Sequence, residues 1–112
     1  MSKQKGQEAE QEACVFLHSM GFEIIERNFF ARYGEIDIVA KKAGILHFIE
    51  VKSGQNFEPT QNLTHTKIKR LIKAINLYEL KNPSKLPYCL DALIIRYDKQ
   101  PRYELLENIT QI

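Results

Sequence analysis

The chain has 112 residues, of which 44% are hydrophobic and 10% aromatic. This length suits one domain, and the apolar content is sufficient for a buried core, which excludes an intrinsically disordered chain. The 16 basic and 14 acidic residues leave a net charge of only +2, so a polyanionic partner would have to be recognised by a local group of charges. With no apolar run near the roughly 20 residues of a membrane span, and a polar N-terminal sequence, we expect a soluble cytoplasmic protein without membrane contact.

The spacing of apolar residues predicts two helices and an early strand. In residues 7–20 apolar side chains recur every three or four positions, which predicts a helix, and Gly21 follows where a helix end favours a left-handed residue. Residues 22–29 are rich in β-branched and aromatic side chains, which predicts a strand. A second helix, capped by a threonine, is predicted over residues 64–80.

Residues 35–40 are predicted to form the first strand of a hairpin. The strict two-residue period of a strand would place Ile36 and Ile38 on one face. Glu35 and Asp37 would then share the opposite face.

Residues 45–52 are predicted to form the second strand of that hairpin, after the turn sequence KKAG. The same alternation places Glu50 and Lys52 together on one face. His47 is expected on the opposite face, away from both.

Two closing strands are predicted over residues 88–97 and 103–109, after prolines that end the second helix. The order of elements is then α-β-β-β-α-β-β within a single domain, residues 1–112. Hairpins combined with helices, without strict β-α alternation, favour an α/β fold in which a mixed sheet is flanked by helices.

Acidic residues on these otherwise apolar strands call for an explanation. Burying a carboxylate among apolar neighbours costs several kcal/mol unless it is paired or binds a metal ion. Asp37 and Glu50 would suit Mg²⁺, which proteins bind through one or two carboxylates together with water and phosphate oxygens. Lys52 could then position an attacking water or hold a phosphate oxygen. The pattern therefore indicates metal-assisted hydrolysis of phosphodiesters.

The same residues also fit a simpler interpretation. Together with Lys41, the charged residues of the hairpin could form cross-strand ion pairs on a solvated face of the sheet, worth about 0.2–1 kcal/mol each. Spacing alone favours this interpretation over a metal site.

A set of motifs along nearly the whole chain nevertheless resembles a known family. The motifs are Gly6, Ala9, Glu10 and Ala13 in the first helix, Gly21-Phe22, Arg27-Asn28, GEIDIVA over residues 34–40, FIEVK over residues 48–52, and Lys67, Arg70, Leu71 and Ala74 in the second helix. In these features the chain resembles the YraN-like family of small bacterial proteins. That family is assigned by similarity to the restriction-endonuclease-like fold and regarded as distantly related to archaeal Holliday junction resolvases.

The resemblance implies catalytic and metal-binding roles for individual residues. Asp37, Glu50 and Lys52 stand at the D…E-x-K positions of that nuclease superfamily. The resemblance further implies that Glu10 is an auxiliary acid on the first helix, with Glu35 close by. The metal would be Mg²⁺ or Mn²⁺, since all-oxygen ligation favours these ions over zinc.

Two positions depart from the family pattern. The family usually carries a basic residue where this chain has Gly54. It also carries an arginine-aromatic pair where this chain has Cys89 and Leu90, just before Asp91.

Basic residues of the second helix are candidates for contacts with nucleic acid. Lys67, Lys69, Arg70 and Lys73 cover its polar side, as either a solvated face or a set of phosphate contacts.

Several other residues are expected to have structural roles. His47 is interpreted as a satisfied, partly buried histidine, and Cys14 and Cys89 as buried free thiols. Tyr33 and Phe57, in loops, could stack on an unpaired base, but packing is the favoured interpretation.

The first functional hypothesis is a Mg²⁺-dependent nuclease acting on nucleic acid, with DNA, including branched or junction DNA, as the expected substrate. The alternatives are a non-catalytic nucleic-acid-binding module and a protein-interaction domain with an inert charged face. Neither the choice between DNA and RNA nor the oligomeric state follows from the sequence, although a two-fold homodimer would suit a four-way junction.

Overall fold

The computed structural model describes residues 2–32, 34–55, 63–98 and 100–111. Tyr33 and Phe57, for which stacking was considered, lie outside the described residues. In chain order the elements are α1 (Ser2–Ser19), β1 (Glu23–Ala31), β2 (Gly34–Lys42), β3 (Ile45–Gly54), α2 (His65–Lys81), β4 (Tyr88–Tyr97), β5 (Pro101–Leu106) and the short 3-10 helix η2 (Ile109–Gln111). The predicted order α-β-β-β-α-β-β is confirmed. Within the described residues, no helix has the length and apolarity needed to cross a membrane.

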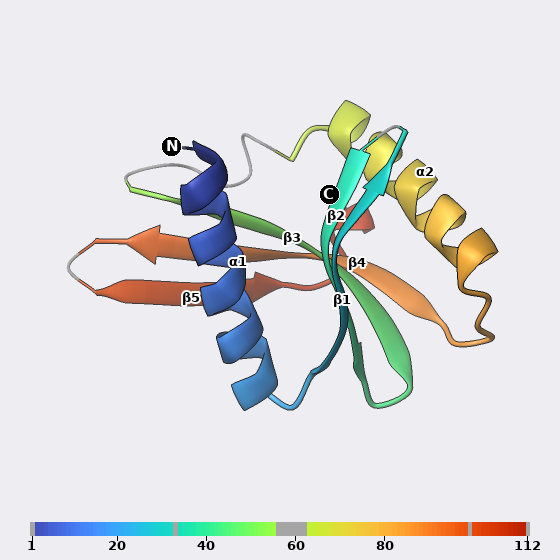
Figure 1. Cartoon of the computed structure of the whole chain (residues 1–112), viewed down its shortest axis with the longest axis horizontal. Helices are drawn as coiled ribbons and strands as arrows, with labels where there is room; N and C mark the ends of the chain where they lie inside the picture. Colours follow the sequence, from blue (N-terminus) through green and yellow to red (C-terminus); the bar gives the residue numbers. More distant parts are fainter. Residues whose placement is uncertain (1, 33, 56–62, 99, 112) are drawn as a thin grey trace.

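The five strands form one mixed sheet in the order β1-β2-β3-β4-β5. Only β3 and β4 run parallel, and α2 forms the crossover between them. The other neighbouring strands are antiparallel. The predicted α/β class, with helices flanking a mixed sheet, is therefore confirmed (Figure 1).

The sheet separates two hydrophobic clusters, each covered by one helix. Ile68, Leu71 and Ile75 of α2 pack on one face, and Ala13 and Leu17 of α1 pack on the other. Strand β4 alternates strictly between them, with Leu90, Ala92 and Ile94 facing α2 and Leu93 and Ile95 facing α1.

The predicted alternation along β2 is wrong at one point. Ile36 packs in the cluster under α2, whereas Ile38 packs in the cluster under α1. Pairing between β2 and β3 extends as far as Ile38 and Ile49. Two residues farther along β3, the amide of Val51 instead donates to the side chain of Asp37, with 2.8 Å between the nitrogen and Oδ2. Strand β2 thus changes direction at Asp37, where it separates from β3.

Two smaller expectations also differ from the structure. The last strand ends at Leu106, not at 109, because Asn108 adopts a left-handed conformation with φ 56° and Ile109 begins η2. Cys14 and Cys89 are free, as expected, but each is only partly buried.

The predicted cap of the second helix offers a test of local stability. Thr64 Oγ1 accepts a hydrogen bond from the Lys67 amide at 3.2 Å and satisfies one of the free donors at the start of α2. We expect Thr64→Ala to lower the free energy of unfolding by about 1 kcal/mol in urea titrations. Thr66→Ala, which alters an exposed residue of the same turn, should change it by less than about 0.5 kcal/mol. Equal losses in the two variants would contradict the role of the cap.

Candidate functional site

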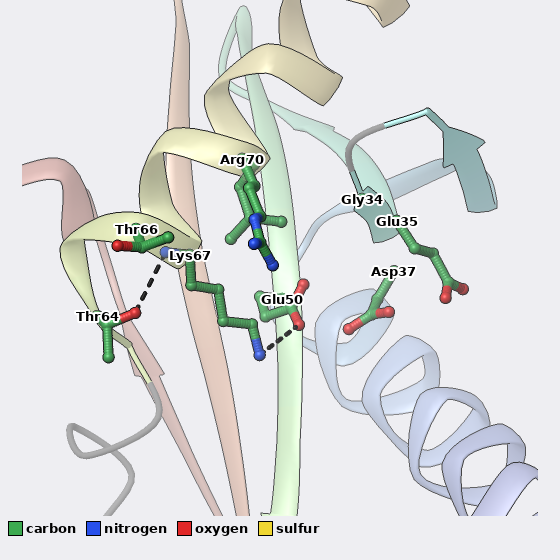
Figure 2. Close-up of a pocket in the computed structure, with 9 residues that line it drawn as sticks. Gly34, Glu35, Asp37, Glu50, Thr64, Thr66, Lys67 and Arg70 are labelled. Atoms are coloured by element: carbon green, nitrogen blue, oxygen red, sulfur yellow. Dashed lines mark hydrogen bonds and ion pairs between the residues drawn. The ribbon is translucent and has the colours of Figure 1, made fainter.

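A pocket of about 480 Å³ opens where β2 separates from β3, beside the first turns of α2. It is lined by Gly34, Glu35, Asp37, Glu50, Thr64, Thr66, Lys67, Arg70 and Leu71. Figure 2 shows the acids of β2 and β3 on one side of this space and the basic side chains of α2 on the other. The pocket therefore combines a carboxylate group with adjacent positive charge.

Asp37 and Glu50 form the buried part of this pocket, being 9% and 8% exposed. Burial, together with the nearby Glu50 carboxylate, raises the pKa of Asp37 to about 8, although the Val51 amide opposes the shift. Burial also raises the pKa of Glu50, while the ammonium groups of Lys52 and Lys67 act in the opposite direction. These acids therefore do not belong to a solvated face of ion pairs, the simpler interpretation of the sequence.

Glu10 and Glu35 reach Asp37 from two different elements. Glu10 belongs to α1 and Glu35 precedes Asp37 by two residues on β2. Carboxylate oxygens of the three residues lie within 4.8 Å of one another. Burial raises the pKa of Glu35, and the Glu10 and Glu50 carboxylates raise it further. The structure thus gathers around Asp37 both acids for which the resemblance implied an auxiliary role.

Glu50 differs from the other acids because it contacts two lysines. Its Oε1 lies 3.4 Å from Lys52 Nζ and 3.7 Å from Lys67 Nζ. Lys52 follows Glu50 by two residues on β3, as the alternation predicted, whereas Lys67 comes from the first turn of α2 (Figure 2). Burial and the neighbouring Lys52 lower the pKa of Lys67. The sequence indicated a role in phosphate binding for Lys67 but gave no sign of its contact with Glu50.

Two carboxylate oxygens in this region lack a hydrogen-bond partner. Glu10 Oε1 and Glu50 Oε2 are both buried, and neither is satisfied within the described residues. Unpartnered buried acceptors are rare because each costs the desolvation energy of the group. A divalent cation among Glu10, Glu35 and Asp37, whose carboxylate oxygens lie within 4.8 Å of one another, would satisfy Glu10 and relieve the repulsion between these acids; Glu50 lines the same pocket but is not one of this group. The donors are all oxygens, so the residues fit Mg²⁺ or Mn²⁺.

Of the four basic candidates on α2, two line the pocket and two do not. Lys67 and Arg70 line the pocket. Lys69 and Lys73 are exposed on α2 and are not among its lining residues. The spacing of three between Lys67 and Arg70 corresponds to one helical turn and places both on the side of the sheet acids.

His47 lies on the other face of β3, as its alternation with Glu50 predicted. It is 7% exposed, and its Nδ1 lies 2.6 Å from Asp91 Oδ2. The sequence gave no indication of this partner, because the register of parallel strands separated by a helix cannot be derived from local periodicity. The role of Thr64 and Thr66 in lining the pocket was missed for a related reason, although the predicted start of α2 could have suggested it.

The raised pKa of Asp37 predicts a loss of stability with rising pH in the absence of metal. Between the ordinary value of 3.8 and about 8, the folded carboxyl retains a proton that the unfolded chain releases. The free energy of unfolding should therefore fall, by up to about 1.4 kcal/mol per pH unit from this group. Urea titrations in EDTA between about pH 5 and pH 8 measure it, with Asp37→Asn as the reference that lacks the titrating group. If wild type does not lose stability relative to Asp37→Asn over this range, the interpretation is wrong.

Comparison with known proteins identifies the family of the chain. The model of the uncharacterised protein family UPF0102 matches residues 9–99. A UPF0102 protein of Helicobacter hepaticus is 60% identical over 109 residues, which cover 97% of this chain and 96% of the relative. One from Helicobacter pylori is 54% identical over 108 residues, covering 96% and 92%, and one from Wolinella succinogenes is 49% identical over 110 residues, covering 98% and 99%. These matches agree with the resemblance to the YraN-like family, and the chain belongs to the uncharacterised protein family UPF0102.

Proposed function

We propose that this protein is a nuclease that depends on Mg²⁺ or Mn²⁺ and hydrolyses phosphodiester bonds, with DNA, including branched DNA, as its substrate. The observation that carries the proposal is the convergence of Glu10, Glu35 and Asp37 beside the Glu50 and Lys52 pair. Such a group of buried and partly buried acids next to a lysine is costly to fold and suits binding of a cation near a phosphate. The proposed activity rests on the chemistry of these side chains, because the fold alone does not establish a function.

Each acid has a role in this proposal. Asp37 and Glu50, which line the same pocket, would hold the cation. Glu10 and Glu35, whose carboxylate oxygens lie within 4.8 Å of an oxygen of Asp37, would contribute further negative charge or a ligand. When bound, the cation supplies neutralisation of charge on the scissile phosphate and acidification of the attacking water.

The basic residues position the substrate. Lys52, on the same face of β3 as Glu50, orients water or a phosphate oxygen as a point charge with three donors. Arg70 offers a planar pair of donors that matches a phosphate group. Lys69 and Lys73 extend the positive charge along α2, so the backbone of a bound strand would follow this helix. A two-fold dimer would present two such pockets to one branched substrate.

The nuclease proposal is tested by cleavage of labelled single-stranded DNA, duplex, flap, four-way junction and RNA in Mg²⁺ or Mn²⁺. We expect Glu50→Gln and Lys52→Ala each to reduce cleavage by at least about 100-fold, the lower end of what one positioned group contributes. Glu23→Gln, which alters an exposed acid at the start of β1, should cleave like wild type. Circular dichroism verifies that the variants are folded. Undiminished cleavage by Glu50→Gln would exclude the proposed site.

A second candidate is a nucleic-acid-binding module without catalysis. One observation favours it: the ammonium groups of Lys52 and Lys67 both form ion pairs with Glu50 and so offset its charge. In that case the pocket would bind a phosphate through Lys67 and Arg70, with the acids serving to hold the lysines in place. Binding of one member of the same panel in EDTA, without cleavage in either metal, would support this module and contradict the nuclease.

Both candidates predict a dependence of binding on salt. If Lys67 and Arg70 each contact a phosphate, the slope of log K against log salt should become shallower by about 0.9 per removed contact on duplex DNA. We therefore expect Lys67→Ala with Arg70→Ala to weaken binding and to reduce this slope by about 2 in fluorescence anisotropy titrations. Lys85→Ala, an exposed cation beyond the end of α2, is the matched control. A slope that the double variant leaves unchanged would place the nucleic acid elsewhere.

A further inference from the structure

A second group of potential metal ligands lies on the opposite face of the sheet from Glu50. His47 on β3 and Cys89 on β4 are partners in the parallel register. Cys89 and Asp91 are two residues apart on β4, so all three side chains project from the same face. Their ligand atoms lie within 4.8 Å of one another. None of these residues belongs to the acidic pocket.

Asp91 and Cys89 both contact the same ring nitrogen of His47. His47 Nδ1 lies 2.6 Å from Asp91 Oδ2 and 3.1 Å from Cys89 Sγ. A ring nitrogen carries at most one hydrogen, which can be donated fully to only one of two such neighbours. A nitrogen of His47, the sulfur of Cys89 and an oxygen of Asp91 thus meet at one point.

The surroundings hold these groups in position. Asp91 is fully buried, and its other oxygen, Oδ1, accepts a hydrogen bond from the Asn108 amide at 2.9 Å. The ring of Phe22 meets the His47 ring edge-on, with centroids 5.0 Å apart. Cys89 is only partly buried, which leaves an approach from solvent. Ligands oriented in this way by neighbouring groups are typical of metal sites.

We propose that His47, Cys89 and Asp91 form a zinc site, in which Nδ1, Sγ and a carboxylate oxygen bind one Zn²⁺ and a water molecule completes the tetrahedron. Zinc takes nitrogen, sulfur and oxygen ligands at about 2.0–2.3 Å in tetrahedral geometry, and a thiolate selects it strongly against Mg²⁺. The proposal is independent of the nuclease, since it uses other residues and another class of ion.

Zinc binds the thiolate form of cysteine, whereas a free cysteine is mostly a thiol at neutral pH. Zinc would displace the proton of Cys89, so binding should release about one proton per ion.

The test uses the full chain freed of metal, with excess Mg²⁺ present to occupy the acidic pocket. Equilibrium dialysis against zinc chloride should give one Zn²⁺ per chain, and Cys89→Ala should lose it. Cys14→Ala is the matched control, because Cys14 is the other free and partly buried thiol and should keep full binding. Thermal unfolding of wild type should shift upward by roughly 10 °C at a hundredfold excess of zinc over Kd, and that of Cys89→Ala should not.

Cobalt provides a direct view of the ligands. We expect wild type and Cys14→Ala with Co²⁺ to show a thiolate-to-metal charge-transfer band that is absent from Cys89→Ala. Calorimetry in buffers of different ionisation enthalpy should count the released proton. Failure of wild type to bind zinc, equal binding by Cys89→Ala, or a cobalt complex without the thiolate band would each overturn the proposal. None of these readouts depends on cleavage of nucleic acid.

Discussion

The bond between the Val51 amide and the Asp37 carboxylate is the contact on which the architecture of the pocket depends. At this point β3 exchanges a backbone partner on β2 for a side chain, and the two strands separate. The separation leaves room for the pocket. It also buries Asp37 near Glu50, and the two carboxylates repel each other. Lys52 and Lys67 compensate one of these charges. Among the residues that the structure describes, one oxygen each of Glu10 and Glu50 still has no hydrogen-bond partner, and this excess of unpaired acceptors makes the region suited to a cation.

Local periodicity predicts which side chains share a face of β3, but it does not predict the faces along β2. The alternation that places Glu50 with Lys52, and His47 opposite, holds because β3 stays in regular parallel pairing with β4 from Leu46 to Gly54, beyond the point where its pairing with β2 ends. The same rule fails between Ile36 and Ile38, because β2 bends where it loses its neighbour. A two-residue period describes a strand within a sheet and carries no information about where the pairing stops.

Contacts between distant elements form the other limit of sequence-based prediction. The basic pattern of α2 was evident, but the contact of Lys67 with Glu50 depends on how the helix docks against the sheet. Glu10 stood at the margin of an apolar stripe, so its position beside Asp37 depends on the rotation of α1 about its axis. His47 and Cys89 are brought together by a parallel register across a helical crossover. Each of these contacts is set by the packing of the whole domain.

The antiparallel hairpin of β2 and β3 also has a consequence for folding. Its short turn makes it one of the most local pairings in the chain, and such contacts can form within microseconds. The hairpin also carries Asp37 and Glu50, and of the two cations that contact Glu50 it supplies only Lys52. The other, Lys67, comes from α2, which the non-local crossover to β4 places on the sheet. The charge balance of the pocket is therefore complete only when the whole domain has folded.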